Sequence, residues 1–233
     1  MQTSACIGVI TIGQSPRIDI ISEFVQVMGY TPRIVERGLL DGLPSEEIAA
    51  LRPRRATSQT LVSRLQNGAE VKLSEWRIRK MMPLAIRDLA QQGDIDAIVL
   101  FCTGEFPRVS TKIPILYPSS IVKSVVSSVL FSKERARRRI GIVAPVPEQF
   151  GMLNQKWRSI AGTVALDALS PYTASEEEIY SCGKRISKLD LDLVVLDCMG
   201  YTGQTKAKLA KQIHTPIVLP RSILARVTAE VLA

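Results

Sequence analysis

Two cysteines occupy matching places in two similar segments of the chain. Cys102 comes directly after the run DAIVLF, and Cys198 comes directly after the run DLVVLD. A glycine stands two residues after each of them, at Gly104 and Gly200. A short apolar strand that ends at a reactive side chain and a glycine-containing turn is typical of the carboxyl edge of an α/β sheet, where ligands bind. These two thiols are therefore the first candidates for chemistry.

Two thiols on opposite sides of one carbon can exchange its proton. One thiolate removes the proton and the opposite thiol returns one to the other face, which is racemisation without a cofactor. Such a site has to favour the thiolate and hold the substrate carboxylate with donors. Buried cysteines are also ordinary in α/β proteins, and we interpret Cys6 and Cys182 in that way. For Cys102 and Cys198, the matched positions favour a catalytic role.

The donors that such a substrate needs are expected in the turns that follow the strands. Ser15 is a plausible N-cap and Pro16 suits a first helical position, so backbone N–H groups there would favour a carboxylate or phosphate. Arg17 could add a charged fork. The alternative is an ordinary helix start without a ligand. The expected substrate-binding residues are Gly13, Gln14, Ser15, Arg17, Thr103, Gly104, Gly200, Tyr201 and Thr202.

Other polar residues near the cysteines give weaker signals. Asp197 could orient or deprotonate Cys198, but a carboxylate beside a thiolate also raises the thiol pKa. The only histidine, His214, precedes a Thr-Pro pair at an expected strand start and is interpreted as structural. The spacings of the four cysteines match no zinc pattern. We therefore expect no metal site and no cofactor.

Composition limits the class of partner. The chain has 233 residues, of which 46% are hydrophobic and only 5% aromatic, so an aliphatic core of parallel α/β type is expected. The net charge of +8 favours anionic partners. Basic runs at 52–55 and 133–139 are interpreted as a solvated loop and a basic helix end, since no nucleic-acid-binding motif accompanies them. A small anionic substrate, rather than nucleic acid, is the expected partner.

The sequence also bears on the compartment of the protein. The N-terminus lacks the basic region of a signal peptide, and no window of 18 consecutive apolar residues occurs. We therefore expect a cytoplasmic protein with reduced thiols and no membrane association. The oligomeric state, with a homodimer among the options, stays open.

Apolar periodicity predicts alternating strands and helices along the chain. An Asn67-Gly68 pair between two alternating runs predicts a β-hairpin over 60–73, and Pro83 is expected to kink or split the helix that contains it. The expected strands cover 6–12, 33–36, 96–101, 113–117, 139–144, 163–169, 193–196 and 216–219. The expected helices cover 16–28, 74–92, 119–130, 147–157, 175–189, 204–212 and 222–232, with a short helix start at 44–47.

An internal repeat organises these elements into two halves. The segment IPILYPSSIVKSVVSSVL at 113–130 aligns without a gap with TPIVLPRSILARVTAEVL at 215–232, and IGVI near the start matches IGIV in the second half. We expect an α/β fold of two Rossmann-like lobes with mainly parallel sheets, related by a pseudo-twofold, with the active cleft between them. The expected N-terminal lobe is 1–117 plus 216–233, with a hairpin insertion at about 38–73, and the C-terminal lobe is 118–215.

Several motifs resemble known families. The two cysteines resemble those of the aspartate/glutamate/hydantoin racemase superfamily, in which each lobe supplies one after a strand. The segments IGVITIGQSPR, VPEQF, NQKW, LDCMGYT and PIVLPRSILARVTAEVL resemble the AroM family over nearly the whole chain. Cys102 is followed by Thr-Gly where the racemases have Asn-Thr, and Cys198 by Met-Gly where they have Thr-His. Their substrate contacts are therefore not transferred to this chain.

The resemblance and the residues together predict an isomerase. We expect a racemase or epimerase, independent of pyridoxal phosphate, that acts on a small carboxylate or amino-acid derivative with Cys102 and Cys198 as its acid/base pair. One alternative is a decarboxylase or lyase that uses a single cysteine on the same scaffold. Another is a protein that binds a small anion without turnover.

Overall fold

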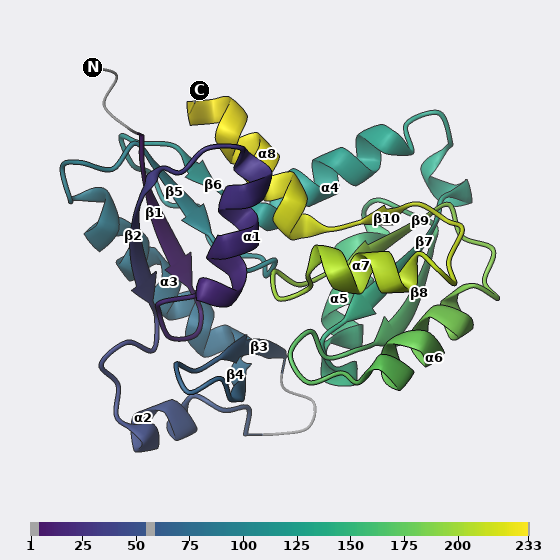
Figure 1. Cartoon of the computed structure of the whole chain (residues 1–233), viewed down its shortest axis with the longest axis horizontal. Coiled ribbons are helices and arrows are strands. Elements are labelled where there is room, and N and C mark those ends of the chain that lie inside the picture. The colour runs from purple at the N-terminus through teal and green to yellow at the C-terminus, as the bar shows by residue number, and fades with distance from the viewer. Residues whose placement is uncertain (1–4, 55–58, 233) are drawn as a thin grey trace. The chain divides into compact units, whose positions relative to one another are not determined.

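The computed structural model describes residues 5–54 and 59–232, which form two compact α/β units (Figure 1). The first unit runs to Ser119 and resumes at Leu224, and the second unit is Ser120–Ile223. The chain therefore passes from one unit to the other within two helices, α4 (Pro118–Val129) and α8 (Pro220–Leu232). Within the described part of the chain, no helix is both long and apolar enough to cross a membrane.

A four-stranded parallel sheet forms the centre of the first unit. Its strand order is β2-β1-β5-β6. The central strands β1 and β5 are buried along their whole length, as continuous Val/Ile-rich runs in parallel sheets usually are. The elements are β1 (Cys6–Thr11), α1 (Ile18–Met28), β2 (Arg33–Gly38), α2 (Ser45–Ala50), β3 (Thr60–Arg64), β4 (Glu70–Ser74), α3 (Glu75–Ala90), β5 (Ala97–Leu100) and β6 (Ile115–Leu116).

The second unit repeats this sheet topology. Its parallel sheet has the order β10-β9-β7-β8, which becomes the order of the first sheet when β7, β8, β9 and β10 replace β1, β2, β5 and β6. The elements are β7 (Arg139–Ala144), α5 (Phe150–Arg158), β8 (Thr163–Ala168), α6 (Glu176–Ile186), β9 (Leu193–Leu196), α7 (Gly203–Leu209) and β10 (Ile217–Val218), with 3-10 turns at Arg135–Arg137 and Pro147–Gln149. The α/β class and the two similar parallel sheets are thereby confirmed.

A glycine in each central strand explains part of the repeat. A Cβ atom on Gly8 of β1 would lie 2.6 Å from the Leu89 side chain, and one on Gly141 of β7 would lie 2.7 Å from the Leu191 side chain. Each glycine therefore lets a leucine pack directly on the middle of its sheet. The shared pattern IGVI and IGIV records this common packing.

The hairpin between β2 and α3 is present as expected (Figure 1). Strands β3 and β4 pair in antiparallel register, and Gly68 has the positive φ of 84° that the turn requires. The side chain of Asn67 accepts the N–H of Ala69 at 3.0 Å. Pro83 does not split α3, which continues through the proline as one helix.

Some boundaries differ from those expected. Helix α1 begins at Ile18, because both the N–H and the hydroxyl of Ser15 bind the carboxylate of Asp41, so Ser15 does not cap the helix. Helices α4 and α8 begin at a proline, one and two residues before the expected serines, in the position that proline favours. The capping box of Ser175 with Glu178 is confirmed.

The boundary between the units also differs near the end of the chain. The stretch 216–223 was expected in the first lobe, but Ile217 and Val218 pair with Val194 and Val195 of β9. Strand β10 is thus the fourth strand of the second sheet, as β6 is of the first, and the second unit extends to Ile223.

Candidate functional site

Each cysteine follows the strand at the switch point of its own sheet. From β1 the chain continues to β2 on one side, whereas β5 lies on the other side of β1 and leads to β6. The same reversal separates β7 from β9 in the second sheet. Ligands of open parallel sheets bind outside the carboxyl ends of the strands at this point. Cys102 follows β5 and Cys198 follows β9, so both lie at the edge where binding is expected.

Each of the two sulfurs accepts an equivalent local hydrogen bond from its own turn. The sulfur of Cys102 accepts the N–H of Gly104 at 3.4 Å, and the sulfur of Cys198 accepts the N–H of Gly200 at 3.3 Å. A donor of this kind stabilises the charged form of the group that accepts it. Cys102 is buried and Cys198 is half-buried. The matching Cys-x-Gly spacing in the sequence therefore corresponds to the same turn in both units.

The remaining two thiols lie in different surroundings. Cys182 is fully buried in α6, and burial, reinforced by the nearby Asp167 carboxylate, raises its pKa to about 12. Burial also raises the pKa of the Cys6 thiol in β1. Both groups therefore stay protonated at neutral pH, in agreement with a structural role.

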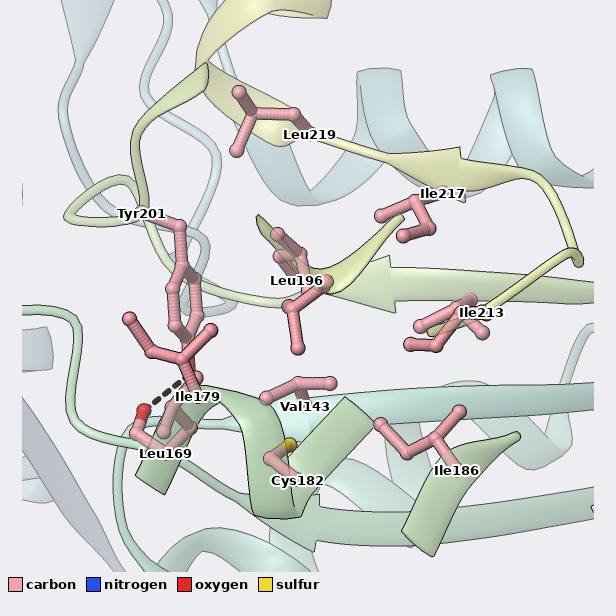
Figure 2. Close-up of a cluster of buried hydrophobic side chains, with 12 residues drawn as sticks. Val143, Leu169, Ile179, Cys182, Ile186, Leu196, Tyr201, Ile213, Ile217 and Leu219 are labelled. Carbon is pink, nitrogen blue, oxygen red and sulfur yellow. Dashed lines mark hydrogen bonds between the residues drawn. The ribbon is translucent and has the colours of Figure 1, made fainter. Parts of the chain in front are cut away.

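Tyr201, which was expected to bind substrate, has its ring in the core of the second unit. Figure 2 shows the ring among Val143, Ile179 and Leu196, with its hydroxyl donating to the Leu169 carbonyl at 2.6 Å. Burial raises the tyrosine pKa well above its ordinary value. Tyr201 therefore anchors the turn after Cys198 to the core of the second unit.

The rest of that turn is bound by residues that the sequence analysis did not select. A Cβ atom on Gly200 would lie 2.8 Å from ring atoms of Tyr172, so the aromatic ring packs directly on the glycine. Arg221, at the start of α8, is buried and donates to the carbonyl oxygens of Met199 and Gly200. The signal for Arg221 was available in the repeat, where an arginine replaces the serine of the first half.

Asp197 takes part in a buried ion pair. The ammonium group of Lys156 lies 3.0 and 2.9 Å from its two carboxylate oxygens, and the indole N–H of Trp157 donates to one of them at 2.6 Å. The Lys156 and Asp197 side chains are 4% and 1% exposed. Lys156 and Trp157 belong to α5, whereas Cys198 packs against the cluster that contains Tyr201 and residues of α6 and α7. Asp197 is therefore bound on the face of the sheet opposite to Cys198.

The turn after β1 was expected to offer backbone donors to a ligand. The N–H of Gln14 donates to the Arg64 carbonyl at 3.2 Å, that of Ser15 to Asp41 at 2.8 Å, and that of Arg17 to Glu36 at 2.6 Å. Burial raises the pKa of the Glu36 carboxyl, although the N–H of Arg17 opposes this effect. A backbone carbonyl and two of the chain's own carboxylates thus occupy these donors.

The Arg17 side chain is also bound within the first unit. Its guanidinium forms two parallel hydrogen bonds of 2.8 Å with the Asp19 carboxylate, and its Nη1 atom lies 3.1 Å from Thr11 Oγ1 and 3.2 Å from Ser63 Oγ. The side chain is almost fully buried. This arginine holds the β3–β4 hairpin and the α1 start together.

The remaining expected donors lie beside the cysteines. Thr103 and Gly104 follow Cys102 directly, and Thr103 is buried. Thr202 is the N-cap of α7, where its hydroxyl accepts the N–H of Thr205 at 3.0 Å. The structure thus brings Thr103 and Gly104 together with Cys102, and Gly200, Tyr201 and Thr202 together with Cys198.

Comparison with solved structures defines the class of fold. Glutamate racemase from Francisella tularensis subsp. tularensis SCHU S4, in complex with D-glutamate, aligns with a TM-score of 0.56 and 12% identity over 99% of this chain and 81% of that one. Glutamate racemase from Thermus thermophilus, in complex with β-chloro-D-alanine, gives 0.57 and 15% over 100% and 82%. Unliganded arylmalonate decarboxylase gives 0.58 and 13% over 98% and 92%. This chain therefore has the α/β fold of the Asp/Glu racemase-like proteins.

The family follows from the sequence. The model of the AroM protein family matches residues 7–232, so the chain belongs to that family. A comparison with curated protein sequences gave no match. The AroM resemblance drawn from the motifs is thereby confirmed, and the relation to racemases is confirmed at the level of the fold.

Proposed function

We propose that this protein is a cofactor-independent racemase or epimerase that acts on a small carboxylate or amino-acid derivative through Cys102 and Cys198. The observation that carries the proposal is that the two sulfurs have equivalent positions and equivalent hydrogen bonds. Each follows the switch-point strand of an equivalent sheet, and each accepts the N–H of the glycine two residues further on. Because the thiolate is the basic form and such a donor stabilises it, both cysteines are suited to proton transfer.

The proposed reaction moves one proton at each sulfur. One thiolate takes the α-proton of the substrate, and the opposite thiol gives its proton to the other face of the carbanion. One C–H bond breaks and another forms, while the two sulfurs exchange protonation states, so the step balances without a redox partner. Thr103 and Thr202 are the proposed donors to the substrate carboxylate. The N–H groups of Gln14, Ser15 and Arg17 are bound within the chain and would have to exchange partners first.

A small anion is the proposed substrate class. The net charge of +8 favours an anionic ligand. One of the structurally similar racemases was solved with D-glutamate, which supports starting from amino acids with a second carboxylate. We further propose a cytoplasmic location, where the thiols would stay reduced.

Exchange of the α-proton in deuterated water tests the proposal. A panel of amino acids and hydantoins is followed by NMR, and at least one compound is expected to exchange. C102A and C198A should each lower the rate by at least about 100-fold, since positioned acid–base groups contribute at least that much. C182S is the matched control, because its thiol is buried in the core of the second unit, and it should keep the wild-type rate.

Two outcomes would overturn the racemase proposal. One is the absence of exchange with every compound, and the other is unchanged exchange in both alanine variants. Thermal stabilisation by a small anion that survives the loss of both thiols would point instead to a binding protein.

A decarboxylase or lyase that uses one cysteine is the second candidate, and the unequal support of the two thiols favours it. Cys198 follows a residue held in a buried ion pair, whereas Cys102 follows Phe101, whose ring centroid lies 5.1 Å from that of Phe24. In a decarboxylation, the bond to a carboxylate breaks, carbon dioxide leaves, and the Cys198 thiol protonates the carbanion. Product mass separates the two reactions, since racemisation conserves it, and the decarboxylase would tolerate C102A.

A further inference from the structure

The Met199–Gly200 peptide group is bound at both of its ends. Its carbonyl oxygen accepts the Arg221 Nε and Nη2 groups at 3.0 and 2.8 Å, and its N–H donates to the sulfur of Cys198 at 3.3 Å. Because a peptide group is planar, fixing its oxygen fixes the direction of its N–H. A cation on the carbonyl also polarises the group and makes the N–H a stronger donor. The guanidinium is thus linked to the sulfur through one peptide.

Arg221 is placed to hold this peptide firmly. Its side chain is 1% exposed, and Nη2 also donates to the next carbonyl, that of Gly200, at 3.0 Å. The Tyr172 ring packs on Gly200 from another side, and Tyr201 is anchored to Leu169. The turn after Cys198 is therefore held by two separate segments of the second unit, the loop 169–172 and the start of α8.

The first unit supports the corresponding turn differently. The gapless repeat places Ser119 where the second half has Arg221. A serine supplies no guanidinium, and its buried hydroxyl has no hydrogen-bond partner among the residues that the structure describes. The N–H of Gly104 still reaches the sulfur of Cys102. Each thiol thus accepts a glycine N–H, and the peptide that donates to Cys198 is bound by an arginine where the first half of the repeat has a serine.

We propose that Arg221 is a positioning residue for Cys198, which keeps the Gly200 N–H on the sulfur and makes Cys198 the more reactive of the two site thiols. The proposal rests on the proposed function only in giving these thiols a role in the reaction. The ionisable groups that interact with Tyr201 of this turn include Cys198, Cys182, Asp197 and Tyr172, and Asp197 is also paired with Lys156. Burial keeps Tyr201 protonated at neutral pH.

Site-resolved alkylation of the full-length protein tests the proposal without any substrate. Iodoacetamide labelling is quenched at intervals between pH 6 and 10, and the rate at each cysteine is read by peptide mass spectrometry. In the wild type, Cys198 is expected to react faster than Cys102 at pH 7. As the pH is raised, the increase in the Cys198 rate should begin at a lower pH than the increase in the Cys102 rate. A Cys102 that reacts as fast as Cys198 or faster would overturn the proposal.

Substitutions then assign the difference to Arg221. R221M should lower the Cys198 rate at pH 7 by about tenfold and move its profile to higher pH, because the thiolate loses a fixed donor. R221K keeps the charge but not the planar fork, so an intermediate loss of about threefold is expected. S119A, the matched change in the first half, should leave both rates unchanged. An unchanged Cys198 rate and profile in R221M would overturn the proposal.

Loss of folding is recognised in the same experiment. The buried Cys6 and Cys182 would become reactive in an unfolded variant, whereas a local effect leaves them protected. If Cys6 and Cys182 become reactive in R221M, that variant is set aside. The Cys198 rate in R221K and the Cys198 to Cys102 rate ratio in the wild type then decide whether the proposal holds. Because alkylation needs no turnover, the positioning role can hold while the racemase proposal fails, or the reverse.

Discussion

Single residues show how differently the two units support the residue before the cysteine. In the second unit, Asp197 is enclosed with Lys156 and the indole of Trp157. In the first, Phe101 packs on Phe24. A buried ion pair adds little net stability over an apolar contact, but it leaves an uncompensated charge when one partner is removed. Loss of one partner of the Lys156–Asp197 pair should therefore lower stability through an unpaired buried charge, an effect that the Phe24–Phe101 contact cannot have.

This risk can be measured by removing the lysine. K156M should lower the free energy of unfolding by about 3–5 kcal/mol, as expected when a buried charge loses its partner. The double variant K156M/D197L should recover part of that loss. Urea unfolding followed by circular dichroism gives both values.

An exposed ion pair provides the control. Arg37 and Asp88 lie 3.0 Å apart with side chains 41% and 52% exposed, so R37M should cost less than about 1 kcal/mol. A loss in K156M no larger than in R37M would contradict the ion-pair account.

At the scale of elements, the β3–β4 hairpin is docked on the turn after β1. Gln14 receives the N–H of Gln66 on its side-chain oxygen at 2.9 Å and donates its own N–H to Arg64. A Cβ atom on Gly13 would lie 2.4 Å from both the Arg64 carbonyl oxygen and the Ser63 hydroxyl. The insertion is therefore part of the first unit at the edge of the sheet where Cys102 lies, and Gly13 permits the close approach.

The substitution G13A should displace this hairpin. The backbone of Arg64 cannot yield as a flexible side chain would, so we expect a loss of about 1–3 kcal/mol in the free energy of unfolding. Amide hydrogen exchange should become faster across β3 and β4. A Cβ atom on Gly93 would point into open space, so G93A should stay within about 0.5 kcal/mol of wild type. Unchanged exchange in the hairpin of G13A would refute the docking argument.

For the whole molecule, the proposed racemisation sets a requirement on the two units. Both sulfurs must reach one carbon from opposite sides, which implies a separation of at most about 7 Å with each sulfur about 3–3.5 Å from the reacting atom. The matched topology gives each unit the same edge and the same Cys-x-Gly turn. The requirement therefore concerns how the units come together during the reaction.

A short bis-alkylating reagent can test that requirement. We expect it to bridge Cys102 and Cys198 within one chain and to abolish α-proton exchange, as peptide mass spectrometry and NMR would show. Cys6 and Cys182 are internal controls, because burial raises the pKa of both thiols and they should remain unmodified. Alkylation of each sulfur separately, without any bridge, would speak for the single-cysteine reaction.

Much of the fold is predictable because its signals are local. Continuous apolar runs such as AIVL and LVVL identify buried parallel strands, and the gapless repeat predicts two sheets of one topology. The spacing also predicts that the two cysteines have matching positions in their turns, while their role in a reaction stays a prediction. The length of the helices was less predictable, since the partner that takes Ser15 away from α1 lies at Asp41, far along the chain.

The occupation of the donors could not be predicted in the same way. A helix start with Gly, Ser and Arg suggests an anion site, but Glu36 and Asp41 bind these groups in the folded chain. Lys156 and Arg221 were missed for a related reason. A basic residue on an amphipathic helix usually lies in solvent, and only the folded chain reveals a buried carboxylate or carbonyl as its partner.

The crossing of the chain between units inside α4 and α8 has a consequence for assembly. Helix α4 follows the first sheet yet packs on the second, where Val122, Val126 and Leu130 join its core. Helix α8 follows the second sheet, and from Leu224 it belongs to the first unit. The halves have thus exchanged their last helices. On the ribosome, the first unit is begun first but receives α8 only after the second unit has been made, so its fold must wait for that helix.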